Sequence, residues 1–353
     1  MTRSYLYGIV EQARPVELDV RGLDGTSRVR VVASGDLGAV VSAHKTAADF
    51  HALPRETVLR YLLAYQRVVE HVMERQVVLP VKFGTVLENA DEARDLVSRT
   101  RTTLGRAFAS MRGMVEIEVA ATWEISRVLQ EIGREPAVVS AREAIERHGH
   151  PSSEDRLQLG QLVKAHLDLR RAAIRDRAFD LLRSLAASVA THALLDDRLV
   201  MNEAFLITSG DLPEFERRVR QLDALLAGQI VFRIVGPLPP YTFCTVDVTR
   251  VSPRQLEEAR RALGLKGEEL DEHVVRGAYR RAAAAAQRQL PGNASKAEPR
   301  FSQLREASEL LLGSCRSDPT DRRFGSDRGD RWLAKIRTTG LDDISPASFG
   351  GGV

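Results

Sequence analysis

The chain is predicted to be an α+β protein with two ferredoxin-like or modified ferredoxin-like α/β domains, joined by long helices and followed by a small helical C-terminal module. Three observations predict this class. Short runs of β-branched and aromatic residues recur through the first 250 residues, and between them lie segments whose apolar residues are spaced by three and four positions. After residue 250 only the second pattern continues. The length of 353 residues is also too great for one ordinary domain, so more than one core is expected.

The N-terminal α+β domain is expected over residues 1–135. Its predicted strands are residues 5–10, 28–32, 37–41, 77–81 and 114–123, and its predicted helices are 55–75 and 91–111. The Gly and Asp of Ala33-Ser-Gly-Asp36 predict a tight hairpin turn. The order βββαβαβ is close to a split β-α-β arrangement with an additional hairpin strand, and residues 114–123 are expected to close this sheet.

The second domain is expected over residues 136–250. Residues 136–190 have an almost wholly helical pattern that breaks at residues 148–153, which predicts a helical hairpin or a long helix. A second ferredoxin-like α+β unit follows. Its predicted strands are residues 199–207, 230–235 and 242–248, with a helix at residues 212–227 that Gly228 ends.

The last part of the chain is expected to be a helical module over residues 251–315 and a mostly disordered tail over residues 316–353. The module has helical patterns at residues 253–263, 271–290 and 298–312. The tail has few large apolar residues other than Trp332, Leu333 and Ile336, which are compatible with one short docking helix.

The charge balance excludes several kinds of partner. The formal net charge is +3, and residues 1–250 contain 33 Lys and Arg against 33 Asp and Glu. Without a basic field, the sequence predicts neither nucleic-acid binding nor attraction to a membrane surface. Because no segment approaches the roughly 20 apolar residues of a membrane span, no membrane insertion is expected. Two distant cysteines, Cys244 and Cys315, indicate no disulfide framework, so we expect a cytoplasmic protein.

No set of residues predicts catalysis, a cofactor or a metal site. The chain has no GxSxG elbow, and Cys244 lies in an apolar run that is typical of a small buried residue. Gly84 lacks the further glycines of a phosphate-binding loop, so a backbone role between a strand and a helix, either a positive φ or a close approach, is the favoured explanation. His148 and His150 form an HxH pair beside Pro151, which is more typical of a loop than of a metal site.

Five segments, in the same order along the chain, resemble the GvpL/GvpF gas vesicle family. They are Tyr5-Leu-Tyr-Gly-Ile-Val10, Gly35-Asp-Leu-Gly-Ala-Val-Val-Ser42, Val78-Leu-Pro-Val-Lys-Phe-Gly-Thr85, Asn202-Glu-Ala-Phe-Leu206 and Gly236-Pro-Leu-Pro-Pro-Tyr-Thr-Phe243. The residues to which the resemblance assigns a structural role are Gly8, Gly35, Asp36, Pro80, Phe83, Gly84, Asn202, Phe205, Gly236, Pro237 and Pro240.

The resemblance implies an N-terminal α/β domain and a C-terminal modified ferredoxin-like domain. It also implies a non-enzymatic accessory factor that binds the hydrophobic gas vesicle shell protein and other accessory gas vesicle proteins during vesicle formation. A minor structural component retained in the shell is the alternative. An enzyme on a ferredoxin-like scaffold is a third possible function, because proteins that share this fold carry out unrelated chemical reactions.

The helical module resembles a degenerate J domain. The resemblance lies in Leu263-Gly-Leu-Lys266, Val274-Val-Arg-Gly-Ala-Tyr-Arg-Arg281 and Phe301-Ser-Gln-Leu-Arg-Glu-Ala-Ser-Glu-Leu310. The loop that should contain His-Pro-Asp reads Gln289-Leu-Pro-Gly-Asn293, which keeps only the proline. The sequence therefore favours docking by this module and does not support engagement of an Hsp70-type chaperone. A generic helical hairpin explains the same pattern.

An apolar partner requires exposed apolar surface on this chain. The candidate contact residues are Tyr5, Tyr7, Tyr61, Tyr65 and Tyr241, because aromatic side chains offer a large contact area at low entropic cost. The same pattern fits tyrosines that pack in the core, and both interpretations are open at this point.

Overall fold

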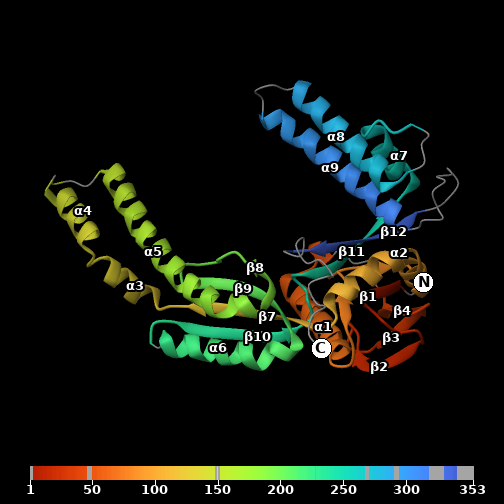
Figure 1. The fold of residues 1–353 in the computed structure, drawn as a ribbon, viewed down its shortest axis with the longest axis horizontal. Helices are drawn as coiled ribbons and strands as arrows, with labels where there is room; N and C mark the ends of the chain where they lie inside the picture. The colour runs from red at the N-terminus through yellow and green to blue at the C-terminus, as the bar shows by residue number, and fades with distance from the viewer. Residues whose placement is uncertain are drawn as a thin grey trace, which may run out of the picture. The chain divides into compact units, whose positions relative to one another are not determined.

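The computed structural model describes residues 3–45, 50–147, 149, 152–226, 228–266, 270–289, 294–317 and 330–339. It divides into two compact units. Unit 1 comprises Met1–Arg112 and Cys244–Thr338, and unit 2 comprises Gly113–Phe243 together with Thr339–Val353. Each unit has both helices and antiparallel sheet, which confirms the α+β class (Figure 1).

The centre of unit 1 is a six-stranded sheet. Its strands are β1 (Arg3–Val10), β2 (Val16–Arg21), β3 (Arg28–Ser34), β4 (Leu37–His44), β5 (Val78–Pro80) and β6 (Val86–Leu87). The order is β2-β3-β4-β1-β5, β6 also pairs with β1, and all pairs are antiparallel. The predicted hairpin turn is confirmed between β3 and β4. β2 and β6 were not predicted, because β2 is largely exposed and β6 is two residues long.

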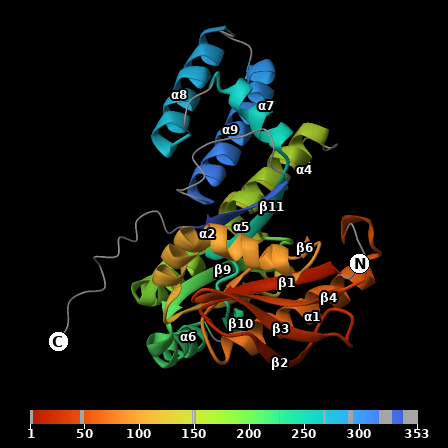
Figure 2. The same ribbon diagram turned by 90° about the vertical axis from the view of Figure 1, so that its right-hand side faces the viewer.

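Two helices cover this sheet. Helix α1 (Arg55–Met73) contacts β1, β2 and β5, whereas α2 (Ala90–Met111) contacts β1, β3 and β4. They lie on opposite faces (Figure 2), which explains why β1 and β4 are buried almost throughout. Asn89 begins α2, since its side chain accepts hydrogen bonds from the backbone N–H groups of Asp91 and Glu92.

Two strands of the C-terminal region belong to unit 1. Strands β11 (Cys244–Val251) and β12 (Arg331–Thr338) pair antiparallel over their full lengths, and the backbone N–H of Lys82 donates to the carbonyl of Val246 at 2.9 Å. The helix expected around Trp332 is therefore wrong, and so is the placement of the strand at 242–248 in the second domain. The remaining tail residues, 318–329 and 340–353, lie outside the described residues.

Three helices connect β11 to β12, and they are α7 (Pro253–Ala262), α8 (Glu272–Gln289) and α9 (Ala294–Ser317). They share a core that includes Leu256, Val275, Leu311 and Leu333 of β12. The three predicted helices are confirmed within a few residues. The J-domain-like resemblance stays a prediction, and the loop residues 290–293 lie outside the described part.

Unit 2 has a ferredoxin-like order of strands. Its elements are β7 (Met114–Thr122), α3 (Ile125–Ile132), α4 (Pro136–Arg147), α5 (Ser153–Leu182), β8 (Ala186–Thr191), β9 (Leu199–Thr208), α6 (Leu212–Leu225) and β10 (Val231–Leu238). The sheet order β10-β7-β9-β8 is that of a split β-α-β arrangement, with strand β9 between β7 and β8. Residues of α5 and α6 complete its hydrophobic core.

One strand assignment and one helix boundary in this region were wrong. Residues 114–123 were expected to close the N-terminal sheet, but β7 pairs with β9 and β10 in unit 2. The helical pattern was also extended to residue 190, where β8 begins at Ala186. The alternation of β7 predicts a strand, but it carries no information about which sheet the strand joins.

Candidate interaction surfaces

Three of the five candidate tyrosines lie in the core of unit 1. Tyr5 and Tyr7 are 0% exposed and Tyr65 is 4% exposed, so these side chains offer no contact area to a partner in this structure. Core packing, the other interpretation of the sequence, is what the structure shows for these three. Tyr61 and Tyr241 are partly exposed.

Each buried tyrosine holds a backbone segment through its hydroxyl group. The Tyr5 hydroxyl accepts from the N–H of Gly84 at 2.8 Å, and the Tyr65 hydroxyl donates to the carbonyl of Val81 at 2.7 Å. The Tyr7 hydroxyl accepts from the N–H of Leu23 at 2.9 Å and lies 2.8 Å from Ser42 Oγ. Burial raises the pKa of Tyr7 to about 12, so this hydroxyl stays protonated at neutral pH.

The turn held by Tyr7 forms one wall of a groove, which we call the α1 groove. The groove has a volume of about 830 Å³ and is lined by residues 21–25 and by Glu56, Leu59, Arg60, Tyr61, Leu63, Ala64 and Arg67 of α1. Leu59 is 49% exposed and Leu63 is 61% exposed. They are one helical turn apart, so they present a continuous apolar strip on the groove.

Leu59 and Leu63 were not among the contact residues predicted from the sequence. The available signal was their spacing of four on a helix whose buried face is formed by Tyr65, Val68, Val69 and Val72. Leucines at positions 59 and 63 lie off that face, and two unburied leucines on one turn indicate a surface for an apolar partner.

The family segments around Gly8 and Gly84 pack the centre of unit 1. Gly8 lies opposite Pro80, and a Cβ atom at Gly8 would lie 2.7 Å from Val78 Cγ2. Gly84 has a φ of 89°, which is the first of the two backbone roles expected for it. The Phe83 ring packs against the rings of Phe50 and Tyr65, at centroid distances of 5.3 and 5.7 Å. Gly8 and Phe83 therefore take part in the packing of unit 1.

The remaining family residues of unit 1 lie at the β3–β4 turn. Gly35 has a φ of 65°, and Asp36 pairs with Arg101 of α2 at 2.9 Å. Both members of this pair are exposed, so the pair contributes little to stability.

The family residues of unit 2 belong to its sheet. Asn202 lies opposite Ala120, and the buried Phe205 ring packs against Phe215 at 5.3 Å between centroids. The Gly236–Pro237 peptide bond is cis, and Pro240 is buried.

A buried carboxylate anchors the segment before β11. Glu116 on β7 is 0% exposed and accepts hydrogen bonds from the Thr242 N–H at 2.8 Å and the Thr242 hydroxyl at 2.7 Å. Burial raises the pKa of Glu116 to about 7.

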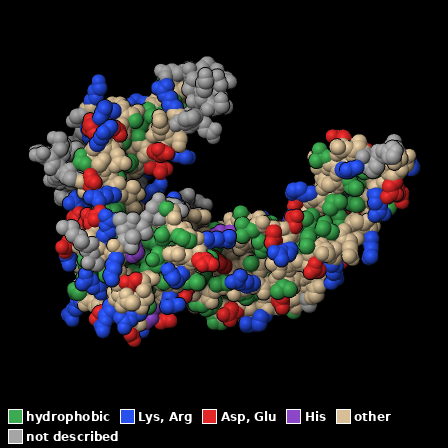
Figure 3. Space-filling model, turned by 180° about the vertical axis from the view of Figure 1, so that it is seen from behind, with side chains coloured by type: hydrophobic (Ala, Val, Ile, Leu, Met, Phe, Trp, Pro, Cys, Tyr) green, Lys and Arg blue, Asp and Glu red, His purple; other side chains and the backbone are tan. Residues whose placement is uncertain are grey.

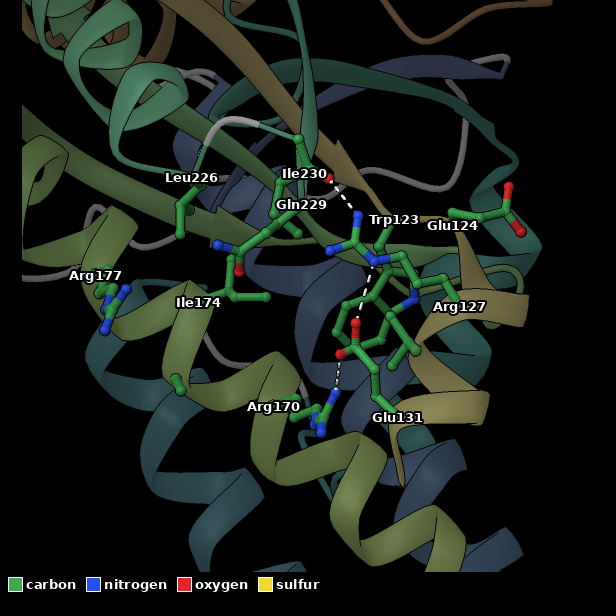
Figure 4. A pocket seen from close by; sticks show the side chains of 13 residues that line it. Trp123, Glu124, Arg127, Glu131, Arg170, Ile174, Arg177, Leu226, Gln229 and Ile230 are labelled. Atoms are coloured by element: carbon green, nitrogen blue, oxygen red, sulfur yellow. Dashed lines mark hydrogen bonds and ion pairs between the residues drawn. The ribbon is translucent and has the colours of Figure 1, made fainter. Parts of the chain in front are cut away.

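Unit 2 contains a partly charged pocket between α3, α5 and the connection from α6 to β10 (Figure 4). Its volume is about 410 Å³, and Trp123, Ile174, Leu226 and Ile230 supply apolar lining. Arg170 of α5 donates to Glu131 at 2.8 Å and to Glu135 at 2.7 Å, and Glu131 also accepts from Arg127 at 3.1 Å. These ion pairs join α3 to α5, so the charged groups have a structural explanation.

The sequence offered few candidate metal ligands and one candidate nucleophile to locate in the structure. No group of three or more His, Cys, Asp or Glu residues is placed to hold a metal ion in the described ranges. His148 and His150 lie outside them. Cys244 is buried and its pKa is raised to about 12 by desolvation, as expected for a small buried residue and not for a nucleophile.

The described surface carries charged side chains of both signs. Acidic and basic side chains alternate over the described surface seen in Figure 3. In the part of the chain that the structure describes, no helix has the length and apolar character needed to cross a membrane.

Comparisons with known proteins match the first two-thirds of the chain. The model of the family described as "Gas vesicle synthesis protein GvpL/GvpF" matches residues 3–245. The chain is 27% identical to gas vesicle protein F of Microcystis aeruginosa over 68% of this chain and 96% of that protein. It is 25% identical to gas vesicle protein F of a Streptomyces species, over 68% of this chain and 98% of that protein.

Two solved structures are also similar to this chain. The crystal structure of GvpF from Anabaena sp. PCC7120 is 25% identical with a TM-score of 0.59, over 69% of this chain and 98% of that one. GvpF from Microcystis aeruginosa is 26% identical with a TM-score of 0.57, over the same shares. Residues 246–353, with α7 to α9 and β12, lie beyond the region that the family model matches.

Proposed function

Because the chain belongs to the GvpL/GvpF family of gas vesicle synthesis proteins, we propose that it is a non-enzymatic, cytoplasmic assembly factor. In this proposal it binds the hydrophobic shell protein and other accessory gas vesicle proteins during vesicle formation. A protein shell that faces gas needs an apolar surface, and an apolar surface in water aggregates unless another protein covers it.

The observation that carries the proposal is the exposed pair Leu59 and Leu63 in the α1 groove. An apolar segment of the shell protein would bury these leucines, and removing their apolar area from water favours association. Arg60 and Arg67 at the same groove supply polar groups at its rim. A polar rim around an apolar centre is typical of protein interfaces.

Buried tyrosine hydroxyls form hydrogen bonds to both walls of the α1 groove, which supports the proposal. Tyr7 holds the turn at Leu23, and Tyr65 fixes α1 to the segment after β5. A preformed groove loses little conformational entropy when it binds, so a modest apolar area can give measurable affinity.

Binding of labelled chain to purified shell protein, by pull-down and by titration up to tens of micromolar, tests the proposal. We expect the double variant L59K/L63K to bind at least about tenfold more weakly, because two lysines must be desolvated in the groove. The matched control is L157K/L169K on α5, where the leucines are 55% and 67% exposed. Equal binding by both variants would place the contact elsewhere, and no binding by the unmodified chain would refute the proposal.

Mass spectrometry of washed vesicles distinguishes an assembly factor from the alternative, a minor structural component retained in the shell. An assembly factor is depleted by washing, whereas a shell component stays at a constant ratio to the shell protein. The same preparations, probed with antibodies to the accessory proteins, identify which of them bind the chain.

A further inference from the structure

The pocket between α3, α5 and the connection from α6 to β10, which we call the α3–α5 pocket, has an apolar base. Trp123, Leu226 and Ile230 of this base are 6%, 2% and 5% exposed, and Ile174 of α5 completes the apolar lining (Figure 4). All the lining residues belong to unit 2. The volume of about 410 Å³ lies within the range of roughly 300–1,000 Å³ that is usual for small-molecule sites.

Hydrogen bonds join the walls of the α3–α5 pocket to one another. Arg127 of α3 donates to the carbonyl oxygen of Gly228 at 3.0 Å and to Glu131 at 3.1 Å. Glu131 also accepts from Arg170 of α5 at 2.8 Å. Helix α3 is thereby joined to both of the other walls. A site whose walls are already joined needs little ordering when a ligand binds, which favours affinity.

The acidic groups of the lining are already in use, whereas one basic group is not. Hydrogen bonds from Arg170 and Arg127 hold the pKa of Glu131 below its usual range, and the Glu124 side chain accepts a backbone N–H at the start of α3. Arg177 of α5 is exposed, lies apart from these groups in Figure 4, and forms no ion pair with the residues that the structure describes. The pocket therefore has an unused cation beside its apolar base.

The chemistry of this lining selects one kind of ligand. A guanidinium group has five N–H donors and no acceptor, so a carboxylate, which has acceptors only, is its best partner. The apolar base favours a hydrocarbon tail. The indole N–H of Trp123 already donates to the carbonyl oxygen of Asp197 at 2.8 Å, so this donor is not available to a ligand. A second polar group on the ligand would lose its hydrogen bonds to water at the base, which costs free energy.

We propose that the α3–α5 pocket binds a monocarboxylate with an aliphatic tail. The carboxylate pairs with Arg177, and the tail packs on Trp123 and Ile174. This pocket shares no lining residue with the α1 groove, so the proposal does not depend on binding of the shell protein.

Titration with octanoate tests the proposal. Trp123 and Trp332 are the two tryptophans of the chain, so the fluorescence of the W332F variant reports Trp123 alone. We expect octanoate to change this fluorescence in a saturable manner. Octanol and octylammonium have the same tail without the carboxylate, and they should bind at least about tenfold more weakly. N-pentanoylglycine, which has a carboxylate and an amide in its tail, models the carboxyl end of a peptide and should also bind at least about tenfold more weakly.

Two pairs of substitutions in the W332F chain locate the site. R177E should weaken the binding of octanoate at least about tenfold. R233E, at an exposed arginine of β10 that does not line the pocket, should leave it unchanged. A173F introduces a ring into the pocket from an exposed alanine of its lining and should abolish binding. A172F, at the neighbouring exposed alanine outside the lining, should not.

Four results would overturn the proposal. They are no binding of octanoate at millimolar concentrations, equal binding of octanol and octanoate, equal effects of R177E and R233E, and equal effects of A173F and A172F. Tighter binding of N-pentanoylglycine than of octanoate would assign the pocket to the end of a peptide and would also overturn it. Circular dichroism verifies that each variant is folded, and calorimetric titration of the unmodified chain verifies that W332F has not changed the affinity.

Discussion

The indole N–H of Trp332 donates a hydrogen bond of 2.8 Å to Oε2 of Glu92. Glu92 lies in the first turn of α2, within the family-matched region, whereas Trp332 belongs to β12 beyond it. Glu92 also accepts from the N–H of Glu88 at 2.9 Å, so one carboxylate fastens both the start of α2 and the added strand. The C-terminal region is therefore integrated into unit 1, and α7 to α9 form an insertion between two paired strands.

The first prediction concerns this contact. W332F keeps an aromatic ring but removes the hydrogen-bond donor. We expect the free energy of unfolding to fall by about 1.5 kcal/mol, the low end for a charged acceptor, because Trp332 is partly exposed. Urea unfolding measures the change. E143Q, an exposed substitution on α4, is the control. A W332F protein as stable as the unmodified chain would show that this hydrogen bond does not fasten β12.

The second prediction concerns two glycines of unit 1. At Gly84 the φ of 89° strains any residue with a Cβ atom, so G84A should destabilise the protein by about 1–2 kcal/mol. Gly105 lies within α2, and a Cβ atom added there would meet no neighbouring atom within 4 Å, so G105A should stabilise by about 0.5–1 kcal/mol. Opposite signs in thermal or urea unfolding are the expected result. Two changes of the same sign would contradict the backbone explanation.

The third prediction concerns the wall of the α1 groove. Y7F leaves the N–H of Leu23 without its acceptor, which should cost about 1–3 kcal/mol of stability because this donor is buried. We also expect weaker binding of the shell protein, since the turn at residues 22–25 is less firmly held. Y61F on the groove surface is the control for stability. A loss of stability without any loss of binding would show that the turn is not part of the contact.

The fourth prediction concerns pH. The pKa of Glu116 is raised from 4.5 to about 7, so the folded protein binds one more proton than the unfolded chain between these values. The resulting contribution of Glu116 to the free energy of unfolding is on the order of 3 kcal/mol. It is fully present below about pH 4.5 and is lost as the pH rises to about 7. E116Q cannot titrate, so its stability relative to the unmodified chain should rise with pH across this window.

Urea unfolding of both proteins at pH 5, 6, 7 and 8 measures this difference, with E143Q on the exposed face of α4 as the control. A difference between E116Q and the unmodified chain that stays constant from pH 5 to pH 8 would contradict the raised pKa of Glu116.

The sequence predicted individual helices and strands correctly where the evidence lay in residues close together in the chain. The spacing of Val69 and Val72 identified α1, and the β-branched runs around Ile9 and Val40 identified β1 and β4. A glycine between a strand and a helix predicted either a positive φ or a close approach at Gly84, and the structure shows the positive φ. The resemblance to the GvpL/GvpF family was also local, because it rests on short segments, and the family match confirms it.

The candidate contact residues show the limit of prediction from local patterns. A tyrosine fits a core and an interface equally well, because its ring is apolar and its hydroxyl finds a partner in either place. Tyr7 and Tyr65 are buried, and their hydroxyl groups form hydrogen bonds to the backbone. Leu59 and Leu63 are exposed, although their spacing is that of ordinary helix residues.

The sequence by itself determined the class of the fold, most of its helices and strands, and the family, since each depends on residues close together in the chain. Only the tertiary structure decided that β7 joins the sheet of unit 2, that β12 pairs with β11, and which side chains of α1 remain exposed. The physical reason is that strand pairing and burial are contacts between distant residues. The alternation of a strand is satisfied by any sheet with an apolar face, so the choice among sheets depends on the packing of the whole unit.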